Sequence, residues 1–109
     1  MSFSYCFELK KIVIPSSVTT IKDNAFLFCS SLKEIVFDSN SSIKTIGECA
    51  FGSCSQLTQI VPPPTLKSIG KYAFKECFSL KNITIPSSIN NVSELGLNYL
   101  VKNSGITYI

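Results

Sequence analysis

Cysteine is the most reactive side chain that this sequence repeats at a regular spacing. Four of the five cysteines are Cys6, Cys29, Cys54 and Cys77, in steps of 23, 25 and 23 residues. Thiolate metal sites usually gather their ligands through short C-x-x-C loops, which this sequence lacks, so no metal is expected. We predict buried, reduced thiols that fill a core, with a disulfide between stacked neighbours such as Cys29 and Cys54 as the alternative. Cys49 lies outside this spacing and is expected to be the accessible thiol.

Side chains suited to acid and base catalysis are scarce. The chain has no His and no Arg, so all ten basic residues are Lys. Its Ser and Cys nucleophiles therefore lack the usual general base, and the sequence has neither a glycine-rich phosphate loop nor a clustered pair of acids. We expect no enzyme and no cofactor. Nucleic-acid binding is not expected either, because Arg is absent and no exposed aromatic platform is predicted.

Lysines recur at equivalent positions along the chain. Lys10, Lys33 and Lys81 form one set, and Lys44 and Lys67 form another. With seven acidic residues, the net charge is +3. A solvated face that discourages aggregation is the favoured interpretation. A patch that attracts an acidic ligand is the weaker alternative, and its signature is binding that depends steeply on salt.

Length and composition limit the organisation of the chain. A total of 109 residues with 45% apolar and 16% charged side chains predicts a single globular domain over residues 1–109. No stretch reaches the roughly 18 apolar residues that cross a membrane, so no membrane span is expected. The first residues show no basic start followed by a long apolar run, which, taken at face value, predicts a cytoplasmic protein.

The sequence repeats itself. The pair Ala-Phe recurs at Ala25-Phe26, Ala50-Phe51 and Ala73-Phe74, and the same register aligns Leu9, Leu32, Leu57 and Leu80, and Ile12, Ile35, Ile60, Ile83 and Ile106. This agreement indicates about four repeats of 23–25 residues, of which the last is degenerate. The phenylalanines of the column, with Phe3 before them, are predicted to form the spine of the core. The two extra residues of the longest repeat fall in the polar turn 38–42.

Each repeat combines several local patterns. From Leu80 to Ile85, apolar residues alternate with others, which predicts a short strand with one buried face. Pro86 ends that strand, and a second short extended piece follows. A glycine such as Gly70 then permits a bend. Residues 73–80 carry apolar side chains at helical spacing, which predicts one or two helical turns.

One such repeat cannot bury its own apolar face. Consecutive repeats must therefore stack, strand beside strand at roughly 4.8 Å, and share one continuous core. The predicted fold is an α/β solenoid.

Two segments carry a resemblance to a known family. The string IPSSVTTIKDNAFLFCSSLKEIVF, repeated as PTLKSIGKYAFKECFSLKNITIP, resembles the leucine-rich repeats of the BspA-like type over about residues 3–109. The resemblance implies a right-handed superhelix, with one short strand per repeat on a concave sheet and short helical turns on the convex side. Such proteins are often surface antigens of bacteria and protist parasites. The resemblance thus implies a cell-surface or secreted protein that recognises or adheres to a host, matrix or self protein.

In such solenoids, the exposed residues between the inward Leu and Ile positions line an open sheet that is the usual partner-binding surface. The predicted contact residues are Lys11, Val13, Glu34, Val36, Gln59, Val61, Asn82 and Thr84. They are expected to bind a protein through shape and many weak contacts. The alternative is a non-catalytic scaffold or truncated repeat fragment that mainly self-associates through its uncapped ends.

The last residues repeat the strand pattern without a polar cap. Ile106 falls in the inward column, and Tyr108 and Ile109 follow it. A solenoid without caps exposes core and strand edges. The chain is therefore expected to be either a piece of a longer array or one whose ends another chain covers. Ile106, Tyr108 and Ile109 form the predicted self-association edge of a homodimer.

Overall fold

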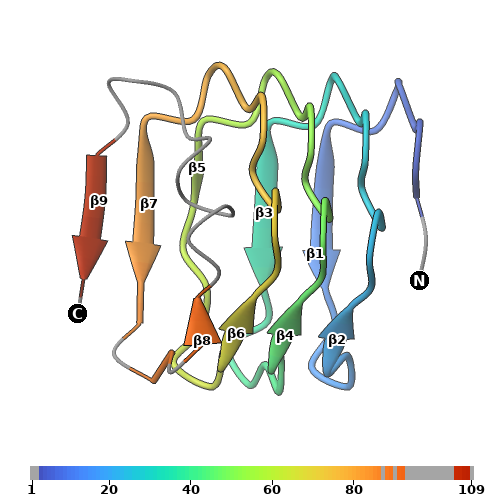
Figure 1. Cartoon of the computed structure of the whole chain (residues 1–109). Helices are drawn as coiled ribbons and strands as arrows, with labels where there is room; N and C mark the ends of the chain where they lie inside the picture. The colour runs from blue at the N-terminus through green and yellow to red at the C-terminus, as the bar shows by residue number, and fades with distance from the viewer. Residues whose placement is uncertain (1–2, 87, 90, 93–104, 109) are drawn as a thin grey trace.

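The fold consists of short parallel strands joined by turns. A computed structural model of the chain describes residues 3–86, 88–89, 91–92 and 105–108. These residues contain nine strands (Figure 1). They are β1 (Lys11–Ile14), β2 (Thr20–Ile21), β3 (Glu34–Phe37), β4 (Thr45–Ile46), β5 (Gln59–Ile60), β6 (Ser68–Ile69), β7 (Asn82–Ile85), β8 (Asn91–Val92) and β9 (Gly105–Tyr108).

Consecutive repeats pair in parallel and in register. β1 pairs with β3, β7 pairs with both β5 and β9, and β2, β4, β6 and β8 form a second sheet in that order. Ile12 lies beside Ile35, and Ile46 lies beside Ile69. Figure 1 shows the odd-numbered strands in one layer and the shorter even-numbered strands in another. The predicted stacking of repeats is confirmed, and the second extended piece of each repeat is also a strand.

The segment that follows the second strand of each repeat is a series of turns. No residue of the described part of the chain is helical, so the prediction of helical turns is wrong. Each such segment holds two residues with a left-handed backbone, for example Asn24 with φ 62° and Phe28 with φ 59°, through which a right-handed helix cannot continue. The N–H of Asn24 donates instead to the carbonyl of Glu48 in the next repeat, at 2.9 Å. The N–H of Phe28 donates likewise to Gly52, so a third row of backbone hydrogen bonds joins the repeats.

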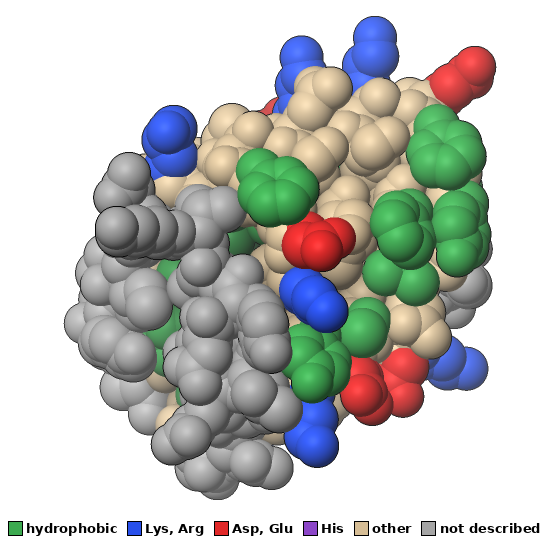
Figure 2. Space-filling model, turned by 45° about the horizontal axis from the view of Figure 1, so that its top comes forward, with side chains coloured by type: hydrophobic (Ala, Val, Ile, Leu, Met, Phe, Trp, Pro, Cys, Tyr) green, Lys and Arg blue, Asp and Glu red, His purple; other side chains and the backbone are tan. Residues whose placement is uncertain are grey.

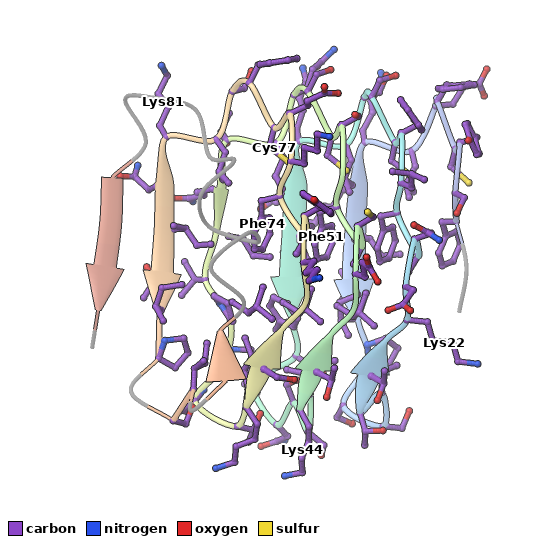
Figure 3. All side chains as sticks on the ribbon, viewed as in Figure 1. Lys22, Lys44, Phe51, Phe74, Cys77 and Lys81 are labelled. Carbon is purple, nitrogen blue, oxygen red and sulfur yellow. The ribbon has the colours of Figure 1, made fainter. Side chains whose placement is uncertain are left out.

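Phenylalanine rings form the spine of the core, as predicted. Phe26, Phe51 and Phe74 are fully buried. Neighbouring rings lie nearly parallel, with centroids 5.3 Å apart for Phe26 and Phe51 and 5.7 Å apart for Phe51 and Phe74. Phe3 extends the stack, 5.5 Å from Phe26. Figure 3 shows Phe51 and Phe74 pointing into the space between the two layers.

The cysteine column donates hydrogen bonds between repeats. The Cys54 thiol donates to the carbonyl of Phe26 at 3.2 Å, and the Cys77 thiol donates to that of Phe51 at 3.0 Å. Cys29 makes the same bond one repeat earlier. All five thiols are free, and these three are fully buried. The column therefore does more than fill space, because each thiol also hydrogen-bonds a carbonyl of the preceding repeat.

Exposure separates the remaining two cysteines from this group. Cys49 is partly exposed, as predicted, but Cys6 is partly exposed too, although its register placed it in the buried column. In the described part of the chain, the repeat of Cys6 has a neighbouring repeat on one side only. Burial raises the pKa of Cys77 to about 12 and holds the pKa of Cys54 well above its ordinary value.

Two glycines are required by close approach between repeats, and not by an unusual backbone as the predicted bend suggested. Neither Gly47 nor Gly70 has a positive φ. A Cβ on Gly47 would lie 2.5 Å from the backbone nitrogen of Asp23, and one on Gly70 would lie 2.6 Å from that of Glu48. Backbone of the preceding repeat therefore occupies the space that a side chain needs.

Replacing Gly47 with Ala should lower the free energy of unfolding by about 1–3 kcal/mol, because the new methyl group must push two backbones apart. Gly52→Ala is the matched control, since the nearest atom to its Cβ would be the end of the flexible Leu27 side chain, at 2.9 Å, while the closest backbone atom, the carbonyl oxygen of Cys49, lies at 3.4 Å. Urea unfolding followed by circular dichroism measures both variants. Equal losses in the two variants would contradict the assignment.

Stability should fall above pH 9 because of the buried thiols. Below that pH the thiols are protonated in both states, whereas above it the unfolded chain releases protons that folded Cys77 retains until about pH 12. Between pH 8 and pH 10.5, Cys77→Ser should therefore lose about 2 kcal/mol less unfolding free energy than the parent chain.

Cys49→Ser is the control for this experiment, because Cys49 is only partly buried and its substitution should change the pH dependence less. Urea unfolding at a series of pH values gives the three curves. Parallel curves for the parent chain and Cys77→Ser would show that burial does not hold the Cys77 proton.

Candidate protein-binding face

The odd-numbered strands place the predicted contact residues on one side of a sheet. Glu34 on β3 is exposed and Ile35 beside it is buried, and β7 repeats the alternation with Asn82 and Ile83. Of the predicted contact residues, Lys11, Val13, Glu34, Gln59, Val61 and Asn82 are exposed, whereas Val36 and Thr84 are half-buried. Together these eight residues form the outer surface along β1, β3, β5 and β7, here called the sheet face.

The sheet face has one break, between β3 and β5. These two strands are neighbours, yet no ladder of hydrogen bonds joins them in the described structure. β5 is short because Pro62, Pro63 and Pro64 follow Val61 directly, and proline cannot donate to a ladder. The inserted turn 38–42 directly follows β3, the strand that faces β5 across the break. A cleft of about 260 Å³ opens here, lined by Lys33, Glu34, Ile35, Thr58, Gln59 and Val61.

Charges on the sheet face are few and mostly exposed. Lys11 and Glu34 form an ion pair across β1 and β3 at 3.8 Å, with side chains 58% and 60% exposed. Such an exposed pair contributes little to stability. Lys33 lies at the cleft and has no ion-pair partner among the described residues. The cleft lining therefore holds one carboxylate that is paired with Lys11 outside the cleft and one ammonium group, that of Lys33, that no carboxylate of the described residues pairs with.

The two sets of lysines do not form a single patch. Figure 3 shows Lys81 and Lys44 pointing outward at opposite edges of the molecule. All five lysines of the two sets are exposed, as a solvated face requires. Only the set of Lys10, Lys33 and Lys81 borders the sheet face, where it precedes β1, β3 and β7.

A second hollow of about 400 Å³ lies over the even-numbered strands, between the ends of β4 and β6. Asp23, Glu48 and Lys71 contribute its charged side chains. The Asp23 carboxylate already accepts a hydrogen bond from the backbone N–H of Glu48 at 2.8 Å. This contact holds two repeats together, so we assign the hollow no ligand.

An exposed aromatic cluster lies on the turns that precede β1 and β3. The rings of Tyr5 and Phe28 are stacked with centroids 5.2 Å apart, and Phe7 meets Tyr5 edge-on at 6.2 Å. All three are substantially exposed, and Figure 2 shows hydrophobic side chains gathered at this N-terminal side. This exposed cluster was not predicted from the sequence. Tyr5 and Phe28 occupy one column of the repeat, 23 residues apart, so their spacing could have revealed the pair.

The predicted self-association edge lies largely on β9. This strand carries Ile106 and Tyr108 and pairs in register with β7, while Ile109 lies outside the described residues. Among the described strands, β9 has a partner on one side only. The position of β9 is thus that of an edge strand.

Other kinds of site find little support in the described residues. They include no group of three or more His, Cys, Asp or Glu side chains that could hold a metal ion. No helix among them is long and apolar enough to cross a membrane.

Solved structures similar to this chain include leucine-rich repeat proteins. A leucine-rich repeat protein from Bacteroides ovatus ATCC 8483 superposes with a TM-score of 0.80 at 28% identity, over 98% of this chain and 32% of its own. The pneumococcal vaccine antigen PcpA gives a TM-score of 0.67 at 28% identity, over 79% of this chain and 27% of its own. The chain therefore spans about a third or less of either protein.

A leucine rich cell surface protein from Faecalibacterium prausnitzii A2-165 shares the fold more distantly, with a TM-score of 0.53 at 24% identity, over 96% of this chain and 41% of its own. No curated protein sequence matches this chain. The family model described as "BspA type Leucine rich repeat region" matches residues 1–107. Nearly the whole sequence fits that model, and the stacked parallel strands agree with it, so this chain belongs to the BspA-type leucine-rich repeat family.

Proposed function

We propose that this chain is a protein-binding module that contacts its partner through the sheet face. The observation that carries the proposal is the arrangement of eight exposed or half-buried side chains on neighbouring parallel strands. Two of them are apolar and unusually open, since Val13 is 51% and Val61 is 57% exposed. Exposed apolar groups on a rigid face are what a protein partner can bury.

Adhesion or recognition at the cell surface is the role we propose for that binding. Support comes from the solved relatives, one a vaccine antigen and another a cell surface protein. The partner is a host, matrix or self protein, and the chain acts without catalysis, as suits a leucine-rich repeat module. A right-handed course with the sheet face on the concave side stays a prediction from the family.

Changing the sheet face on both sides of the cleft should weaken partner binding. Val13→Glu combined with Thr84→Glu places charge on β1 and β7 without touching the cleft lining. Surface plasmon resonance against purified matrix proteins, host surface proteins and the chain itself measures binding. We expect any protein that the parent chain binds to lose about tenfold in affinity, because two charges must then be buried against the partner.

The matched control carries the same charges on the other sheet, as Thr20→Glu on β2 combined with Ser68→Glu on β6. This control should bind as the parent chain does. Circular dichroism and thermal unfolding verify that both double variants fold. If the control loses as much affinity as the sheet-face variant, the sheet face is not the contact surface.

Self-association through β9 is a second candidate activity, because an edge strand offers unpaired backbone groups to another chain. Light scattering over a range of protein concentrations should show a mass that rises toward that of a dimer. Thr107→Lys on β9 should shift the mass toward the monomer, whereas Thr45→Lys on the inner strand β4 should not. A monomer at every concentration would exclude this candidate.

A further inference from the structure

The cleft on the sheet face arises where one step of the stack fails to form its ladder. At the equivalent position of other repeats, the N–H of Lys33 donates to the carbonyl of Lys10 at 2.9 Å, and that of Lys81 donates to Thr58 at 3.0 Å. In the described structure, Thr58 makes no such bond to Lys33. Further along the chain, the N–H of Asp38 donates to the carbonyl of Ile14 in the preceding repeat. Pro63 occupies the equivalent position in the next repeat, and proline has no N–H to donate.

At this step, the backbone bond from Thr58 to Lys33 and the one that a donor at Pro63 would make are therefore missing, and the groups concerned are open to another partner. Backbone N–H and C=O groups require a hydrogen-bond partner, and water supplies one in an open cleft. A bound group that offers its own donors or acceptors can replace that water. The break is thus a place where a ligand meets unpaired backbone in the middle of an otherwise closed sheet.

Size and position favour the side chain of a protein partner over a small molecule. The cleft measures about 260 Å³, below the roughly 300–1,000 Å³ of pockets that enclose drug-sized ligands. It lies between β1 and β7, near the centre of the sheet face. Residues that dominate the binding energy of an interface cluster near its centre and fill pockets there.

The charges and donors at the cleft select the kind of side chain. Glu34 is already paired with Lys11 at 3.8 Å, whereas the ammonium group of Lys33 has no ion-pair partner among the described residues. The Thr58 hydroxyl and the Gln59 carboxamide add neutral donors to the same lining. A carboxylate satisfies both the positive charge and these donors, and hydrogen bonds to it are stronger because it is charged.

We propose that the cleft between β3 and β5 is the anchor subsite of the sheet face, and that it takes an Asp or Glu side chain from the protein partner. This assignment deepens the proposed function and rests on it. The Lys33 ammonium group pairs with the carboxylate, and Thr58 and Gln59 fix its orientation. The rest of the sheet face then contributes shape and apolar contact around this anchor.

The test uses two short peptides as probes, N-acetyl-Gly-Glu-Gly-amide and the same peptide with Gln in place of Glu. Each is titrated into the isotope-labelled chain, and backbone amide signals are followed by NMR. The Glu peptide should shift the signals of Lys33, Glu34, Thr58 and Gln59 in a saturable way. The Gln peptide should bind about two- to fivefold more weakly, because it lacks the charge that pairs with the exposed Lys33.

Two lysine variants sharpen the experiment. Lys33→Gln should remove the preference for the Glu peptide, whereas Lys81→Gln, in the same column but beside the paired strands β5 and β7, should retain it. Both lysines are exposed, so neither change threatens folding, and the dispersion of the amide signals verifies this. Added salt should weaken the binding of the Glu peptide more than the binding of the Gln peptide.

Several results would overturn the anchor assignment. These are equal binding of the two peptides, no saturable shift at the cleft, unchanged binding by Lys33→Gln, or tighter binding of inorganic phosphate than of the Glu peptide at the same signals. If any of these results is found but the sheet-face variant Val13→Glu with Thr84→Glu still loses partner binding, the anchor assignment is wrong. The proposed function of the sheet face is then retained. If Lys33→Gln does not change peptide binding and the sheet-face variant does not change partner binding, both proposals are wrong.

Discussion

Backbone hydrogen bonding between consecutive repeats is the interaction on which the whole structure depends. Parallel strand pairing and a row of turn-to-turn hydrogen bonds join consecutive repeats, with β3 and β5 as the one unpaired step in the described structure, and the buried hydrophobic side chains of the described residues form a single core cluster. Because the rows are in register, residues at equivalent positions of consecutive repeats lie side by side. The stacked phenylalanine rings and the thiol hydrogen bonds follow from that register. Glycine is required at positions 47 and 70 because the register brings two backbones too close together for a side chain.

Much of this could be read from the sequence, because the repeat reports contacts directly. A column that keeps Phe26, Phe51 and Phe74 in place predicts a core spine, and the alternation in each strand predicts which side faces solvent. Both predictions agree with the burial of these residues. The sequence could not give the backbone of the turns. Apolar residues spaced for a helix also suit a chain of tight turns, and at Asn24 the left-handed φ goes together with a hydrogen bond to Glu48 of the next repeat, a contact that no local pattern reports.

The candidate site shows the same division. The period of two placed the eight face residues on the correct side of the sheet, since alternation depends only on local geometry. The cleft was not predicted, because it results from two causes in different repeats. The insertion at 38–42 and the prolines after Val61 each read as an ordinary turn feature, and only their stacking shows that one ladder cannot form. The exposed pair of Tyr5 and Phe28 was missed because the more regular phenylalanine column hid it.

The break between β3 and β5 also changes the symmetry of the surface. A face built from near-identical repeats has translational symmetry, so a partner that fits one repeat fits the next almost equally well and can slide between them. In the described part of the chain, one step of the odd-numbered layer lacks its ladder. That single irregularity distinguishes one position on the periodic surface from all the others. A partner that recognises it has one position on the solenoid instead of several.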